Sequence, residues 1–185
     1  MKIKDVHLKD LLEIHEDTAK LMLGSTRMVI MPADSIGELM EFIMQISDEN
    51  MLEMFFYRMG EHAGQHDAET LKRDFSPDTL EDWLAMGPAI HSGEGIVHAK
   101  PEVMEVDPDN GHFLFKGVWE NSFMAEQWLD RIGQVDHPVC TLLTGYANGY
   151  VTKIMGHEVE ARETACIAKG DDVCRFEIRF KEEWD

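Results

Sequence analysis

The stretch Pro138-Val-Cys-Thr-Leu-Leu-Thr-Gly-Tyr-Ala-Asn-Gly-Tyr150, with Glu163, Cys166 and Cys174 beyond it, decides how the end of this chain folds. Proline suits the first position of a helix, and the large apolar residues that follow recur three or four positions apart, as they do on one helix face. These residues are Leu142, Leu143, Tyr146, Tyr150 and Ile154. The stretch therefore predicts a helix over 138–155, and the segments 157–166 and 173–180 predict a hairpin that turns at 169–172.

The three cysteines of the chain and one glutamate in this region have the character of a metal site. Cys140 would be the third residue of the predicted helix, where free N–H groups and the helix dipole favour a thiolate. Cys166 and Cys174 flank the turn of the hairpin, which brings their strands side by side. With Glu163 they would complete a closed tetrahedral site of the kind that holds structural zinc.

The spacing of Glu163 and Cys166 opposes a simple metal site. They lie three residues apart, so a regular strand would point them to opposite faces, and only a bulge or bend would let both bind one ion. The chain also lacks a pair of cysteines separated by two residues. From the spacing alone, three buried free cysteines stay open as an alternative to zinc.

The first half of the chain predicts short strands followed by helices. Strands are expected over 11–31, a helix opens at Pro32, and a second helix covers about 49–73. A third helix is expected to start with Ser76 as its N-cap and Pro77 at its first position, and to run to a break at Gly87-Pro88.

The middle of the chain predicts a hairpin and a short helix. The segments 95–100 and 113–119 are strand-like and flank the turn sequence 108–111, and a helix is expected near 121–131. Because the strands come in hairpins and the helices are grouped, the sequence predicts an α+β fold with an antiparallel sheet.

Composition excludes several classes of function. The chain has 185 residues, a formal net charge of −19 and a pI near 4.7. Binding to nucleic acid or to anionic lipid needs a basic face, which this balance opposes. The sequence offers no signal peptide and no apolar stretch long enough to span a membrane, so we expect a cytoplasmic protein.

Three segments together resemble the 4-vinyl reductase domain family, and within it the N-terminal aromatic-sensing domains of NtrC-class transcription activators that respond to phenols. The first runs from Pro138 to Tyr150 and continues to Cys174; the others are Ala85-Met-Gly-Pro-Ala-Ile-His91 and Val118-Trp-Glu-Asn-Ser-Phe123. The resemblance covers about residues 8–184. It implies a zinc-stabilised α+β fold with a ligand-binding domain over 36–185, and dimerisation through an N-terminal strand region over 1–35.

The resemblance also implies functional residues. Zinc would be held by Cys140, Glu163, Cys166 and Cys174. The hydroxyl of a phenol would form hydrogen bonds with His91 and Trp119. The ligand would regulate a sigma-54-dependent ATPase that is attached to the domain or a partner of it. Four further positions, where phenol sensors tend to carry bulky wall residues, are here Leu84, Gly117, Thr144 and Ala161. Smaller walls imply a larger or reshaped pocket.

The chemistry of these residues suits a phenol. A phenol is neutral at pH 7 because its pKa is about 10, and its hydroxyl can both donate and accept a hydrogen bond. A neutral imidazole offers the acceptor, and an indole N–H is a donor only. We expect a sensor rather than an enzyme, because three cysteines and a glutamate leave zinc no open position for catalysis. The alternatives are a tetrapyrrole-associated reductase factor, for which the wider family is named, and a scaffold dimer that binds no small molecule.

Overall fold

A four-stranded antiparallel sheet forms the centre of the structure, which is a computed structural model that describes residues 1–184, with Asp5 described by its backbone only. The strands are β4 (His98–Asp107), β5 (His112–Glu120), β6 (Val159–Ala165) and β7 (Cys174–Phe180). They lie in the order β4-β5-β7-β6, and all neighbours are antiparallel. The predicted α+β class is therefore confirmed.

Both predicted hairpins are present in this sheet. β4 and β5 are joined by the short 3-10 helix η2 (Pro108–Asn110), and β6 and β7 by η3 (Ile167–Lys169). Alternate residues of β7, from Cys174 to Phe180, are buried, as the strand period requires. The register of β6 on β7 shifts between Glu163 and Ala165, so the bulge that a shared metal site demands is present.

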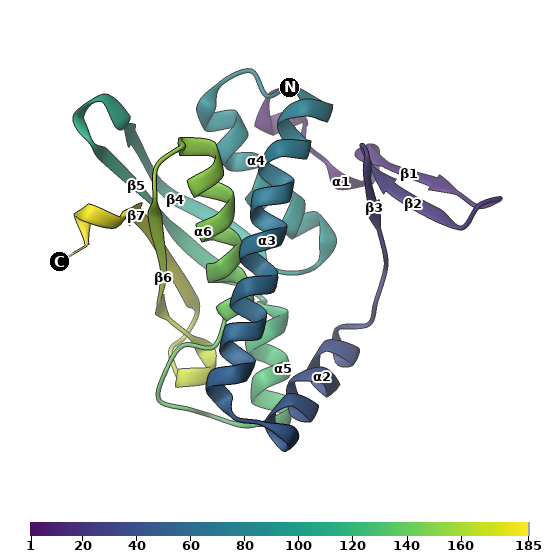
Figure 1. The fold of residues 1–185 in the computed structure, drawn as a ribbon, viewed down its shortest axis with the longest axis vertical. Helices are drawn as coiled ribbons and strands as arrows, with labels where there is room; N and C mark the ends of the chain where they lie inside the picture. Colours follow the sequence, from purple (N-terminus) through teal and green to yellow (C-terminus); the bar gives the residue numbers. More distant parts are fainter. Residues whose placement is uncertain (185) are drawn as a thin grey trace.

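The longer helices lie on one side of the sheet (Figure 1). They are α2 (Ala33–Ile46), α3 (Glu49–Phe75), α4 (Leu80–Glu94), α5 (Phe123–Arg131) and α6 (Thr141–Met155). Before them the chain forms η1 (Ile3–Asp5) and α1 (Leu8–Leu11), and after the sheet it ends in η4 (Lys181–Glu183). α6 lies between the sheet and the long helix α3, so its side chains face both (Figure 1).

Glycines on both helices allow α3 and α6 to pack backbone against backbone. A Cβ at Gly60 would lie 2.1 Å from the carbonyl oxygen of Leu142, and a Cβ at Gly149 would lie 2.1 Å from that of Glu61. Gly64 and Gly145 make equally close approaches. Any larger residue would separate the helices, so the pair Gly145-x3-Gly149 serves close packing within the domain.

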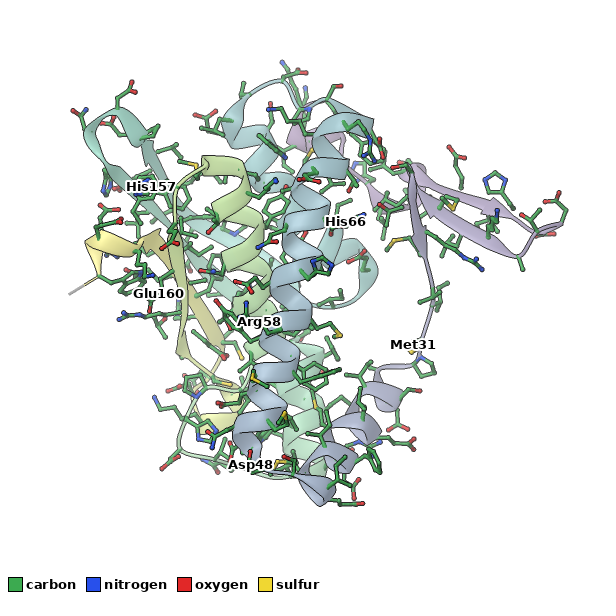
Figure 2. All side chains as sticks on the ribbon, in the orientation of Figure 1. Met31, Asp48, Arg58, His66, His157 and Glu160 are labelled. Carbon is green, nitrogen blue, oxygen red and sulfur yellow. The ribbon has the colours of Figure 1, made fainter. Side chains whose placement is uncertain are left out.

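A separate three-stranded sheet stands away from the body of the molecule (Figure 1). It consists of β1 (Leu12–His15), β2 (Lys20–Leu23) and β3 (Thr26–Met28), in that order. The carboxylate of Asp74, on α3, accepts hydrogen bonds from the backbone and the hydroxyl of Ser25 at 2.8 and 2.7 Å. Met31 marks the extended linker that leads from this sheet to α2 (Figure 2).

Three predictions about helix ends were wrong. Ser76 does not begin a helix: it has a left-handed backbone and ends α3, whereas the hydroxyl of Thr79 caps α4 by accepting from the N–H of Asp82. α4 does not break at Gly87-Pro88 but continues to Glu94. Cys140 is the N-cap of α6 and not its third residue.

No helix within residues 1–184 is both long and apolar enough to cross a bilayer.

Candidate functional site

An apolar cavity lies between the sheet and the helices that cover it. About 410 Å³ of this region is free of protein atoms, including space that opens to solvent. The lining comes from α4, β4, β5, α6 and β7: Leu84, Pro88, His91, Ala99, Phe115, Trp119, Leu143, Tyr146, Ala147, Tyr150, Val151, Phe176 and Ile178. A mostly apolar cavity with a few polar groups at its wall is typical of a small-molecule site.

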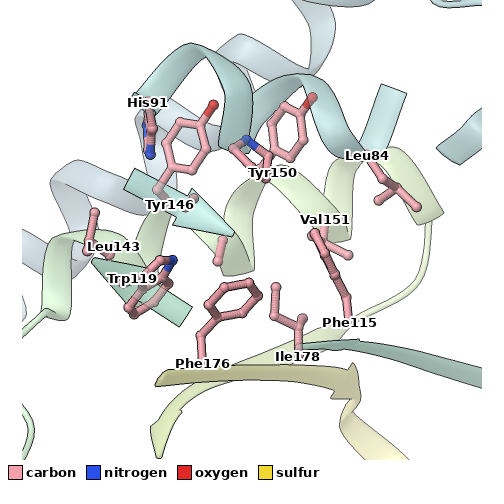
Figure 3. Close-up of a pocket in the computed structure, with 13 residues that line it drawn as sticks. Leu84, His91, Phe115, Trp119, Leu143, Tyr146, Tyr150, Val151, Phe176 and Ile178 are labelled. Atoms are coloured by element: carbon pink, nitrogen blue, oxygen red, sulfur yellow. The ribbon is translucent and has the colours of Figure 1, made fainter. Parts of the chain in front are cut away.

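The two predicted polar residues, His91 and Trp119, line this same cavity from opposite sides (Figure 3). His91 comes from α4, and its ring packs on Tyr146 with the ring centroids 3.8 Å apart. Trp119 comes from β5, and its indole stacks on Phe176 with the centroids 4.9 Å apart. The period of the strand places Trp119 and Phe115 on one face, so both rings reach the cavity.

Burial keeps His91 neutral. It lowers the pKa of the imidazole to about 4, and burial is the one cause of this shift. At pH 7 one ring nitrogen of His91 is therefore a free acceptor. Trp83 and Trp184 donate their indole N–H groups to backbone carbonyls at 3.0 Å. The indole N–H of Trp119, which lines the cavity, makes no hydrogen bond to the described residues 1–184. An acceptor and a donor thus face one apolar space.

The four predicted wall residues have different places. Leu84 is fully buried and lines the cavity. Gly117, Thr144 and Ala161 are not among its lining residues. A Cβ at Gly117 would lie 2.2 Å from the carbonyl oxygen of Lys100, so the approach of β4 requires a glycine there.

The other two predicted wall positions lie on α6 and β6. The hydroxyl of Thr144 donates to the carbonyl of Thr141 within its own helix, at 3.0 Å. Ala161 lies directly opposite the lining residue Ile178 in the β6–β7 register, as Gly117 lies opposite Phe176 in the β5–β7 register. Residues that are directly opposite point to the same face of a sheet, so Gly117 and Ala161 border the cavity without lining it.

Sequence reasoning left out most of the aromatic lining. Tyr146 and Tyr150 were expected on one side of a helix but were not assigned to the ligand site, and their rings stack 5.5 Å apart along the cavity. Phe176 and Ile178 were expected only to face the core. The signal that could have found them is their strand period with Cys174, which places all three on the face that Trp119 shares.

The four predicted metal ligands converge at the N-terminal end of α6. Their ligand atoms all lie within 4.8 Å of one another. The sulfur of Cys174 lies 3.8 Å from that of Cys140 and 3.9 Å from that of Cys166. A tetrahedral ion with metal–sulfur bonds of about 2.3 Å would separate its sulfurs by about 3.8 Å. A disulfide would need about 2.05 Å, so the cysteines are free.

The surroundings of this cluster fit a cation. Burial raises the pKa of the Cys140 thiol and raises the pKa of Glu163 to about 8, whereas hydrogen bonds with the neighbouring thiols lower the pKa of Cys166. Ionisation of all four groups would bury several negative charges together, and a bound cation would offset them. One carboxylate oxygen of Glu163 accepts from the N–H of Cys140 at 2.8 Å, and the other is buried without a partner. The N–H of Ile167 donates to the sulfur of Cys174 at 3.4 Å. Such N–H···S bonds orient a thiolate ligand.

Two known regulatory proteins are similar in sequence to this chain. It is 32% identical over 184 residues to the phenol regulator MopR of Acinetobacter guillouiae, a match that covers 98% of this chain and 33% of the relative. It is 30% identical over 166 residues to the transcriptional regulatory protein XylR of Pseudomonas putida, a match that covers 89% of this chain and 29% of the relative. The chain thus spans about a third of the length of these two curated relatives.

Two solved structures resemble this chain, one closely and one in fold alone. The crystal structure of the phenol-responsive sensory domain of the transcription activator PoxR with phenol superposes with a TM-score of 0.90 at 29% identity, covering 96% of this chain and 89% of that one. A trafficking protein particle complex subunit 3 from Naegleria fowleri, covalently bound to palmitic acid, has a TM-score of 0.52 at 14% identity over 80% of this chain and 92% of that one, and shares the fold alone.

Two family descriptions match consecutive parts of the sequence. Residues 118–180 match the 4-vinyl reductase domain, which confirms the resemblance drawn from the segment that begins at Pro138. Residues 7–107, more than half of the chain, match the family described as "Activator of aromatic catabolism". This chain therefore belongs to the family of activators of aromatic catabolism.

Proposed function

We propose that this chain is a sensory domain that binds a phenol-type aromatic compound between His91 and Trp119. The observation that carries the proposal is the pairing of one free acceptor and one free donor in an otherwise apolar cavity. A phenol hydroxyl would donate to the imidazole and accept from the indole, while its ring fills the aromatic lining. A plain hydrocarbon would leave both polar groups without a partner, which costs about 1–3 kcal/mol.

The names of its relatives support this assignment. The superposed PoxR domain is described as phenol-responsive, and MopR as a phenol regulator. Because the chain spans about a third of MopR, its regulatory output is part of the proposal. Ligand binding would control a transcription-activating ATPase of the sigma-54-dependent class, attached to this domain or separate from it, in the cytoplasm. The domain itself would contact no nucleic acid and would catalyse no reaction.

The second part of the proposal is a structural zinc ion held by Cys140, Glu163, Cys166 and Cys174. Its support is the spacing of the sulfurs and the buried, unpartnered oxygen of Glu163. Four protein ligands close the coordination sphere, so the ion would tie the start of α6 to the β6–β7 hairpin and would not take part in catalysis. Metal analysis of freshly purified protein should find one zinc per chain, and less than half an equivalent would contradict this assignment.

We further propose that Leu84, Gly117, Thr144 and Ala161 set how large a ring substituent the site admits. Leu84 lines the cavity, and the small residues Gly117 and Ala161 lie opposite the lining residues Phe176 and Ile178. Substitution of Ala161 by phenylalanine would fill the border of the cavity. It should weaken binding of ring-substituted phenols by about tenfold more than binding of phenol itself, and equal weakening would contradict this role.

The N-terminal region is proposed to form a homodimer. The strand region over 1–35 and the adjoining helices expose large apolar side chains: Val29 is 73% exposed, Ile30 88%, Met31 57%, Phe42 54%, Ile46 68% and Met54 54%. Exposed apolar groups at this density mark an interface rather than a solvated face. Light scattering should give a dimer for the native chain and a monomer for Ile30→Asp, and a monomeric native chain would refute the proposal.

Titration calorimetry with phenol and toluene tests the ligand assignment. We expect phenol to bind about 5- to 150-fold more tightly than toluene. His91→Leu should abolish this preference, whereas His91→Gln, which keeps an acceptor, should retain part of it. Equal affinity of the native protein for the two compounds would refute the proposal. Tight binding of a tetrapyrrole would favour the reductase-factor alternative, and no binding of any of the three would favour the scaffold.

A further inference from the structure

α4 keeps its helical course at a proline with help from a side chain of α6. Pro88 has no N–H, so the helix lacks a donor for the carbonyl of Leu84. One residue earlier, the N–H of Gly87 donates to the hydroxyl of Tyr150 at 3.1 Å. The same hydroxyl donates to the carbonyl of Trp83 at 2.5 Å. Gly87 and Trp83 are the i and i−4 partners of one helical hydrogen bond, so the tyrosine hydroxyl connects the two groups of one turn.

The local sequence is adapted to this contact. A Cβ at position 87 would lie 2.9 Å from Cε1 of Tyr150, so a residue other than glycine would displace the ring. Tyr150 is 1% exposed, and burial raises the pKa of its hydroxyl, which therefore stays protonated and able to donate. Its ring stacks on Tyr146, so the side chain has one well-defined position.

Tyr150 also belongs to the ligand site. Its ring lines the cavity, while its hydroxyl points away from the cavity toward α4 (Figure 3). His91 follows Gly87 by four residues, which is about one helical turn. On the basis of the proposed function, we infer that Tyr150 is the positioning residue of this site. Its hydroxyl holds the N–H of Gly87 and the carbonyl of Trp83 at a fixed separation, and this turn of α4 then places His91 within hydrogen-bond distance of the ligand hydroxyl.

The inference has a clear geometric consequence. Without the hydroxyl, the N–H of Gly87 and the carbonyl of Trp83 lose the side chain that joins them, and the turn that precedes His91 loses this support. The part of α4 beyond Pro88 carries Ile90 and His91 in continuous helix, so a change at Gly87 is transmitted to the imidazole. A hydrogen bond tolerates only about 0.5 Å of change in its length, so a small shift of His91 breaks its bond to the ligand.

Tyr150→Phe tests this role because it keeps the ring in the cavity and removes only the hydroxyl. We expect the preference for phenol over toluene to fall from about 5- to 150-fold to less than about threefold, with toluene affinity unchanged within about twofold. A purely structural loss would weaken both ligands equally. Tyr57→Phe is the matched control: it makes the same chemical change on α3, outside the cavity, and should keep the native preference.

Three outcomes overturn the inference: an unchanged preference in Tyr150→Phe, an equal loss for both ligands, or the same collapse in Tyr57→Phe. If Tyr150→Phe does not fold, a phenol titration of the native protein followed by nuclear magnetic resonance decides instead. The chemical shift of the Gly87 amide should then change during the titration, with the same dissociation constant that calorimetry gives, and an unchanged chemical shift overturns the inference.

If the native protein shows no preference for phenol, the proposed function fails. Amide exchange of Gly87, expected to be faster in Tyr150→Phe, then still decides whether the hydroxyl supports α4.

Discussion

Acidification should destabilise this domain through the single buried imidazole of the ligand site. His91 is 7% exposed, and burial lowers its pKa to about 4 in the folded chain, against about 6.5 when unfolded. Between these two values the unfolded chain binds more protons than the folded chain. The stability that depends on neutral His91 is therefore complete above about pH 6.5 and is lost as the pH falls toward 4.

The size of this effect follows from the two pKa values. A pKa difference of about 2.5 corresponds to at most about 3.4 kcal/mol, reached only well below pH 4. Between pH 7 and pH 5 the loss attributable to His91 is about 2 kcal/mol by the same relation. Phenol binding should stay nearly constant over this interval, because at pH 5 about nine tenths of the folded molecules still carry a neutral imidazole.

Urea unfolding at pH 7 and pH 5 measures this loss if a non-titrating variant is included. Glu94, whose pKa is raised to about 7 by burial and by Asp67, also contributes to the pH dependence, but it does so in both proteins. The native chain should lose about 2 kcal/mol more than His91→Gln between the two pH values. Equal losses in the two proteins would show that His91 is not held neutral by burial, and would remove the free acceptor from the proposed site.

Other substitutions should affect stability and binding in defined ways. Gly149→Ala would place a Cβ 2.1 Å from the carbonyl of Glu61, so it should lower the free energy of unfolding by about 2 kcal/mol or more in urea titrations, whereas Asn148→Ala on the same helix should change it little. Asp48→Ala removes the carboxylate that accepts from the N–H of Met51 at 2.9 Å and should cost about 1 kcal/mol; a smaller effect than Asn148→Ala would refute this cap. Removing zinc with a chelator should weaken phenol binding before the far-ultraviolet circular dichroism changes, and unchanged binding in metal-free protein would refute the coupling.

The parts of the fold that depend on local pattern could be predicted from the sequence. The strand period of β7 and the turn after Asp107 follow from residues close to one another in the chain. The bulge after Glu163 could be expected only on the assumption that Glu163 and Cys166 bind one ion. The family resemblance supplied His91 and Trp119, which the fold brings to one cavity. Composition and spacing alone would not have singled them out.

The features that the sequence did not indicate depend on contacts between residues that are distant in the chain. Gly87-Pro88 looked like a helix break because the hydroxyl that supports the turn belongs to Tyr150, on another helix. Gly117 stays a proposed border residue of the pocket, but its missing side chain also accommodates the backbone of Lys100, which the sequence does not indicate. In both cases a glycine makes room for a distant group, and one sequence read alone does not identify which group that is.

The two proposed sites are parts of one structure. Cys174 lies directly opposite Trp119 in the β5–β7 register, so a proposed metal ligand and the proposed hydrogen-bond donor are cross-strand neighbours on the same face. Cys140 caps α6, whose next turns carry Tyr146 and Tyr150 into the cavity. A zinc ion would therefore fix both the strand that presents Trp119 and the helix that supports His91 through Tyr150. Loss of the metal would act on the ligand site by displacing these two groups relative to each other, and this geometry explains why a metal without an open coordination position would matter to a sensor.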